Sequence, residues 1–167
     1  EIMGSAPKLA ENLNTNPGLI DSLLEFNTRK RPTLAHLSNE LNANLDQDLH
    51  FEDVLDTVRR TINSHKLIVG AQALKGILNW KEISRRYSDL AVITIQFLHT
   101  AVKKEFEKKH GKVIKGESAI ISLGKVGGNE MTPTSDLDLI FVYRYKENTK
   151  LSDTAMSLNP SLYFTRL

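Results

Sequence analysis

Apolar residues recur at helical spacing through most of the chain before residue 111. From about Phe51 to Leu78 they follow a period of roughly 3.6 residues, at Val54, Leu55, Val58, Ile62, Leu67, Ile68, Ala71, Leu74 and Ile77. A shorter stretch begins near Thr33 and carries Leu34, Leu37, Leu41 and Leu45. After a joint at Asn79-Trp80, the longest stretch runs from roughly Lys81 to His110 and ends before Gly111. The pattern predicts three successive helices.

Two short helices are predicted nearer the N-terminus, over residues 5–14 and 17–26. Asn16 is a good N-cap ahead of Pro17, whose fixed ring suits the first helical position. The apolar stripe of the second helix indicates packing against the rest of the protein, and its members are Leu19, Ile20, Leu23, Leu24 and Phe26.

The pattern changes after residue 118, where two apolar runs enclose a polar loop. The first run, Ala119 to Leu123, is short, rich in isoleucine and bounded by Gly124, which is typical of a buried strand. The second begins at Ser135, alternates acidic and apolar residues, and then becomes wholly apolar up to Tyr143. It predicts a second strand that is buried at its far end.

Two carboxylates lie at the start of this second run, at Asp136 and Asp138. Side chains at i and i+2 of a strand point to one face, so the two acids are expected to project together. Neighbouring carboxylates repel, and a divalent cation between them removes the repulsion. Oxygen ligands without a nearby histidine or cysteine favour Mg²⁺ or Mn²⁺ over zinc.

The loop between the runs is glycine-rich. Gly124, Gly127 and Gly128 would let the backbone turn with positive φ and would let a ligand approach closely. Their N–H groups could hold phosphate oxygens. Beside a paired-carboxylate metal site, such a loop indicates nucleotidyl or phosphoryl transfer. The residues also allow a simpler structure, a β-hairpin with two exposed acids.

The spacing Gly-x-x-Gly-Gly-x-Glu-Met-x-x-x-Ser-Asp-x-Asp-Leu resembles the nucleotidyltransferase superfamily that includes DNA polymerase beta. Within it, the segment GKVGGNEMTPTSDLDLIFVY is most similar to the glutamine synthetase adenylyltransferase family. Val126 and Met131 stand where that family usually has Leu, and both remain apolar. The matching positions are Gly124, Lys125, Gly127, Gly128, Glu130, Ser135, Asp136, Asp138, Leu139, Phe141 and Tyr143.

The resemblance implies a reaction and a set of roles. AMP would pass from ATP to a tyrosine of glutamine synthetase, and the family's other catalytic half would remove it, regulating nitrogen assimilation. Asp136 and Asp138 would be catalytic metal ligands. Gly124, Lys125, Gly127, Gly128 and Ser135 would face the nucleotide. Glutamine synthetase is the implied partner, with a PII signalling protein as a second one.

The resemblance also implies an α+β fold. Residues 1–115 would be a helical region that leads into the catalytic domain, and residues 116–167 would hold the first strands of a truncated polymerase-beta-like core. The family normally supplies a third carboxylate from a later strand, and no matching segment occurs here. We therefore expect this chain to be inactive alone. With only two strands, residues Leu139 to Tyr143 should also expose a face and an edge.

The composition excludes some classes of function and leaves others open. The 167 residues are 40% hydrophobic and 25% charged, with a formal charge of +2 that favours neither nucleic acid nor membrane as a partner. Cysteine is absent, which excludes disulfides and fits a cytoplasmic protein. Two other functions stay open, a helical docking or regulatory fragment with idle acids, and a nucleotidyltransferase with a different acceptor.

Overall fold

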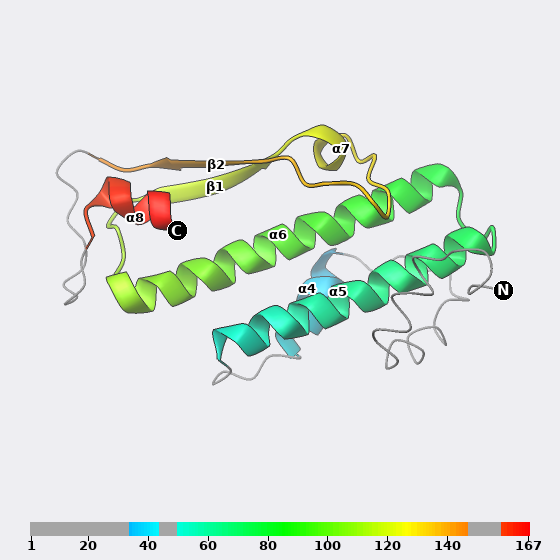
Figure 1. Ribbon diagram of the computed structural model, residues 1–167, viewed down its shortest axis with the longest axis horizontal. Coiled ribbons are helices and arrows are strands. Elements are labelled where there is room, and N and C mark those ends of the chain that lie inside the picture. The colour runs from blue at the N-terminus through cyan, green and yellow to red at the C-terminus, as the bar shows by residue number, and fades with distance from the viewer. Residues whose placement is uncertain (1–33, 44–49, 147–157) are drawn as a thin grey trace.

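The computed structural model describes residues 34–43, 50–146 and 158–167, and the helices predicted over 5–14 and 17–26 lie outside these ranges. Within them, the longest helix lies between a hairpin of two strands on one side and a second long helix on the other (Figure 1). This mixture of helix and a small antiparallel sheet is compatible with the α+β class. No helix in the described ranges is long and apolar enough to cross a membrane.

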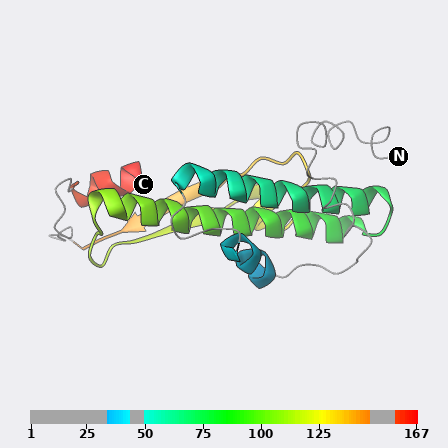
Figure 2. The same ribbon diagram turned by 90° about the horizontal axis from the view of Figure 1, so that it is seen from below.

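Three helices form the helical part of the fold, and they are α4 (Leu34–Ala43), α5 (Phe51–Leu74) and α6 (Trp80–His110). Helices α5 and α6 run side by side in opposite directions, and α4 packs against both (Figure 2). All three begin within a residue or so of the predicted starts.

The bend between α5 and α6 is set by local signals. Helix α5 ends earlier than the predicted Leu78, because Gly76 adopts a φ of +65° and the Ile77 N–H donates to the Gln72 carbonyl at 3.0 Å. Helix α6 then starts with a capping box. Its Asn79 side chain accepts from the Glu82 N–H at 3.0 Å, and the Glu82 carboxylate accepts from the Asn79 N–H at 2.8 Å.

The helices and the glycine loop share one hydrophobic core. Its members come from α4, α5, the bend, α6 and residues 124–131, and they are Leu37, Leu41, Val58, Ile62, Val69, Leu78, Tyr87, Leu90, Ile93, Val126 and Met131. The Tyr87 hydroxyl crosses from α6 to donate to the Lys66 carbonyl of α5 at 3.2 Å. Burial raises the pKa of Tyr87 to about 12. The division of the chain at residue 115 stays a prediction.

The hairpin joins β1 (Glu117–Ser122) to β2 (Leu139–Arg144). The strands are antiparallel, with Glu117 opposite Arg144 and Ser122 opposite Leu139. An ion pair closes the open end, where Arg144 Nη2 lies 2.6 Å from Glu117 Oε2. The short helix α8 (Pro160–Arg166) packs near this end, and its Phe164 ring stacks on Tyr143 with centroids 4.9 Å apart.

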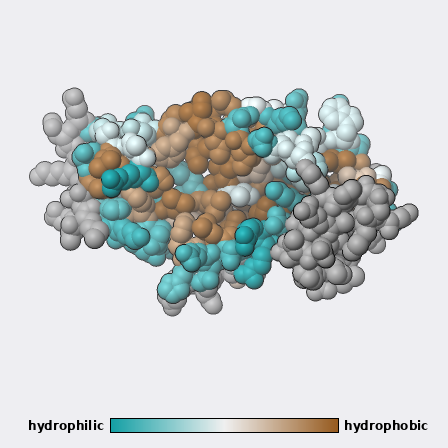
Figure 3. Space-filling view, viewed as in Figure 1, coloured by the Kyte–Doolittle hydropathy of each residue, from teal (hydrophilic) through white to brown (hydrophobic). Residues whose placement is uncertain are grey.

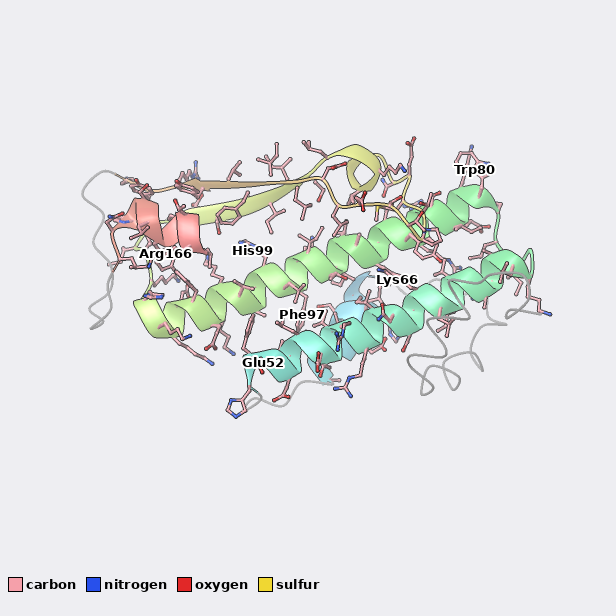
Figure 4. All side chains as sticks on the ribbon, in the orientation of Figure 1. Glu52, Lys66, Trp80, Phe97, His99 and Arg166 are labelled. Atoms are coloured by element: carbon pink, nitrogen blue, oxygen red, sulfur yellow. The ribbon has the colours of Figure 1, made fainter. Side chains whose placement is uncertain are left out.

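One face of the hairpin contacts α6 through His99, which lies between that helix and the strands (Figure 4). Its Nε2 is 3.1 Å from the Ser118 Oγ, and its ring meets the Phe141 ring edge-on. Desolvation, with a smaller contribution from Lys103, lowers the pKa of His99. The side chains of Ser118, Ile120 and Phe141 therefore define the inner face of the hairpin.

The prediction that the second strand is buried at its far end is wrong. Every residue of β2 is exposed, from 45% at Ile140 to 37% at Phe141 among its apolar members. The outer face carries Ile121, Ile140 and Val142, and it forms the hydrophobic area seen over the hairpin in Figure 3. None of the described elements covers this face. The exposed face expected of a two-stranded sheet is thus observed.

Candidate functional site

The residues singled out from the sequence lie in one closed loop, residues 123–138, at the end of the hairpin opposite the Glu117–Arg144 pair. The Leu123 N–H donates to the Asp138 carbonyl at 2.8 Å, which continues the strand pairing one step past Ser122 and Leu139. Asp138 is therefore held by the sheet although it precedes β2. The loop leaves the hairpin and returns to it at this hydrogen bond.

The glycine-rich part of the loop is one turn of helix, α7 (Gly124–Gly127), in place of an irregular loop. Gly124 has the predicted positive φ, +54°, whereas Gly128 has a φ of −82° and the prediction of positive φ is wrong there. Gly127 serves close approach instead, because a β-carbon there would lie 2.8 Å from the Ser122 carbonyl oxygen. Packing between backbone segments explains this glycine.

Gly124 and Asp138 contact each other directly. An Asp138 carboxylate oxygen occupies the space that a β-carbon on residue 124 would need. The positive φ of Gly124 independently disfavours any other residue. The first glycine of the loop and the second acid of the pair are thus matched to each other in space.

The other predicted site residues have defined surroundings. Ser135 closes a small turn, where its Oγ accepts from the Thr132 N–H at 2.9 Å and lies 2.8 Å from the Thr132 Oγ1. The Lys125 carbonyl accepts from the Glu130 N–H at 2.8 Å, while the Lys125 side chain is exposed. Gly124, Gly127 and Gly128 are exposed as well.

Asp136 lies between the Ser135 turn and Asp138, and both acids are exposed. The prediction that both acids belong to one strand is wrong, because β2 begins at Leu139. Only Asp138 joins the strand pairing, and convergence of the two carboxylates on one ion stays a prediction. The donor set itself suits Mg²⁺, which proteins hold by one or two carboxylates together with substrate phosphates. In the described ranges no group of three or more His, Cys, Asp or Glu side chains is placed to bind a metal.

Sequence reasoning missed how the loop is fixed to the helices. Val126 and Met131 are 3% and 7% exposed and belong to the helical core. The Met131 N–H donates to the Ser88 Oγ of α6 at 3.3 Å. Two apolar residues inside a polar loop were the available signal for this anchoring. Nothing in the sequence near Ser88 indicated its contact.

Comparison with known proteins finds the same family that the motif resembles. The family model described as "Glutamate-ammonia ligase adenylyltransferase" matches residues 1–167. A "Bifunctional glutamine synthetase adenylyltransferase/adenylyl-removing enzyme" of Brucella suis is 36% identical over 167 residues. Proteins with the same description in Mesorhizobium japonicum and Rhizobium meliloti are 36% and 34% identical. Each match covers 99% of this chain and 17% of the relative.

Each of these three relatives is named as an adenylyltransferase, so the class of protein that this chain resembles is the adenylyltransferases. The match of the family model over the whole chain then identifies the family. The chain belongs to the glutamate-ammonia ligase adenylyltransferase family. It spans about a sixth of the length of the curated relatives it matches.

Proposed function

We propose that residues 123–138 hold ATP and Mg²⁺ or Mn²⁺ in a nucleotidyltransferase core that transfers AMP to a tyrosine of glutamine synthetase. The observation that carries the proposal is the contact between Gly124 and Asp138, which brings the glycine half and the acidic half of the motif to one place. Glutamine synthetase enters through the names of the relatives. A PII signalling protein as partner and a cytoplasmic location rest on the family resemblance alone.

Residues of this chain would bind the metal and the triphosphate and would hold the loop in place. Asp136 and Asp138 would hold the metal, whose chemistry is to lower the pKa of the attacking hydroxyl and to neutralise charge on the phosphates. The exposed Lys125 would add a point charge toward the triphosphate. Ser135 would hold the backbone that precedes Asp136 in a fixed turn, through its hydrogen bond with the Thr132 N–H. The tyrosine oxygen would bond to the α-phosphorus as the bond to pyrophosphate breaks, and its proton would pass to solvent.

Transfer is proposed over removal of AMP because the sequence of residues 5–26 resembles the segment ahead of the family's C-terminal catalytic domain. Those residues lie outside the described ranges. Removal by the same kind of site would be phosphorolysis of the AMP–tyrosine bond, and the relatives' names include both activities.

The test is a chimera in which these 167 residues replace the matched segment of the Brucella suis relative. With Mg²⁺, labelled ATP and glutamine synthetase, the chimera should label the synthetase. Asp136→Asn and Asp138→Asn should each abolish labelling, since the metal-holding charge is lost and metal stabilisation is worth several kcal/mol, roughly a thousandfold in rate. An exposed acid elsewhere, Asp56→Asn, is the control. Near-normal labelling by either motif variant would refute the assignment.

A further inference from the structure

Ser88 lies in α6, outside the motif, yet it contacts the loop that carries the motif. Its side chain has no exposed area. Its Oγ accepts from the Met131 N–H at 3.3 Å and donates to the Ser84 carbonyl at 2.9 Å. The bond to the Ser84 carbonyl alone would satisfy the hydroxyl of a buried serine, and bonds of this kind are common in helices. The first bond joins residues 43 positions apart in the chain.

Met131 transmits this contact to the candidate metal ligands. The next residue, Thr132, forms the turn closed by Ser135, and Asp136 follows that turn directly. On the other side, Asp138 is fixed by the Leu123 N–H. The backbone is therefore held on both sides of Asp136. On one side the strand pairing holds Asp138, and on the other the hydrogen bond from the Met131 N–H to Ser88 holds the loop.

We propose that Ser88 is a positioning residue for the metal site, acting through the Met131 amide to fix Asp136 relative to Asp138. The inference rests on the proposed function of the two acids. Groups that hydrogen-bond directly to a metal ligand commonly change metal affinity by 10- to 100-fold. Ser88 acts from further away, through Met131 and the Ser135 turn, so an effect at the lower end of that range is expected. The hydrogen bond to Ser88 adds an orientation that packing does not give. The side chains of Val126 and Met131 anchor the loop in the core, and the bond to Ser88 fixes the direction of the Met131 N–H.

The helix supplies a matched control. Thr94 Oγ1 donates to the Leu90 carbonyl at 2.6 Å, in the same manner that Ser88 donates to Ser84. Thr94→Val removes that bond further along the helix, whereas Ser88→Ala removes the equivalent bond together with the acceptor of the Met131 N–H. Comparing the two variants separates the loop contact from the loss of a hydroxyl that bonds the carbonyl four residues earlier.

The experiment measures Mn²⁺ binding to the 167-residue chain by electron paramagnetic resonance, with Mn²⁺ alone as the probe. Wild type should bind Mn²⁺, and Asp138→Asn should lose that binding. Ser88→Ala should bind about tenfold more weakly, while Thr94→Val should bind as wild type does. Amide hydrogen exchange at residues 131–136 should quicken in Ser88→Ala only.

The outcomes separate the two ideas. Equal Mn²⁺ affinity in wild type and Ser88→Ala, with binding still dependent on Asp138, would overturn the role of Ser88 alone. Mn²⁺ binding that is absent from wild type, or that keeps its affinity in Asp138→Asn, would overturn the proposed function and the role of Ser88 with it. Should Ser88→Ala not fold, Ser88→Cys carries the test, since a thiol is similar in shape but a weak acceptor. An affinity equal to wild type in that variant would overturn the inference.

Discussion

The carboxylate of Asp138 lies against Gly124 in the space that a β-carbon would fill. These residues come from the two ends of the loop, and the Leu123–Asp138 hydrogen bond brings them together. The glycine is therefore needed for two reasons, its positive φ and the acid beside it. This relationship lets the geometry of the site be probed without touching either acid.

We expect Gly124→Ala to destabilise the chain by about 1–2 kcal/mol, from the strained backbone alone, and to displace the Asp138 side chain. Urea unfolding measures the first effect and Mn²⁺ binding the second. Gly128→Ala is the matched control, because its φ is −82° and its nearest neighbour would lie at an ordinary 3.5 Å. Equal stability of the two variants would contradict the conformation described for Gly124.

The burial of Met131 and the exposure of Ile140 predict different losses of stability when each residue is mutated. Met131→Ala should cost about 2–3 kcal/mol, because Met131 is 7% exposed inside the helical core. Ile140→Thr on the outer face of β2 should change stability by less than about 0.5 kcal/mol, since Ile140 is 45% exposed. Thermal and urea unfolding measure both. A larger loss of stability for the Ile140 variant than for the Met131 variant would contradict the burial of Met131 and the exposure of Ile140.

Tyr87 predicts a stability loss confined to alkaline pH. Its pKa is 10.0 when unfolded and about 12 when buried, so the neutral form is favoured in the folded state. Its contribution is fully present below pH 10 and declines as pH rises toward 12, by up to about 1.4 kcal/mol per pH unit. Wild type should therefore lose stability relative to Tyr87→Phe over this range in urea unfolding. The burial of Tyr163 acts in both proteins and cancels. A pH-independent difference would show that Tyr87 is accessible.

The capping box of α6 predicts a second contrast. Asn79→Ala should lower the unfolding free energy by about 1 kcal/mol, because the Glu82 N–H loses its acceptor. Glu82→Gln should cost much less, since a glutamine oxygen can still accept from the Asn79 N–H. Differential scanning calorimetry of the two variants checks this. Equal losses would indicate that the charge at Glu82, and not the hydrogen bond, stabilises the helix start.

Local signals allowed the helices and the motif to be predicted from sequence. Helices α4, α5 and α6 follow from apolar periodicity, and the end of α6 at Gly111, with a φ of +74°, follows from glycine. The start of α8 at Pro160 also follows from local signals, since the Asn159 side chain caps the helix and proline suits its first position. The family could also be predicted, because its motif, which includes Asp136 and Asp138, is contiguous in sequence.

Burial and long-range contacts were decided by the tertiary structure. The apolar run of β2 indicated side chains that gain from burial, but no described element covers its outer face, so Ile140 and Val142 are exposed. The second acid could be placed beside a glycine only once the strands were paired. The Ser88–Met131 bond joins two segments with no shared pattern. Sequence determined which residues favour helices or turns and which carry acidic side chains, because those properties depend on near neighbours. Only the fold decided which of these residues meet, because contact depends on how distant segments pack.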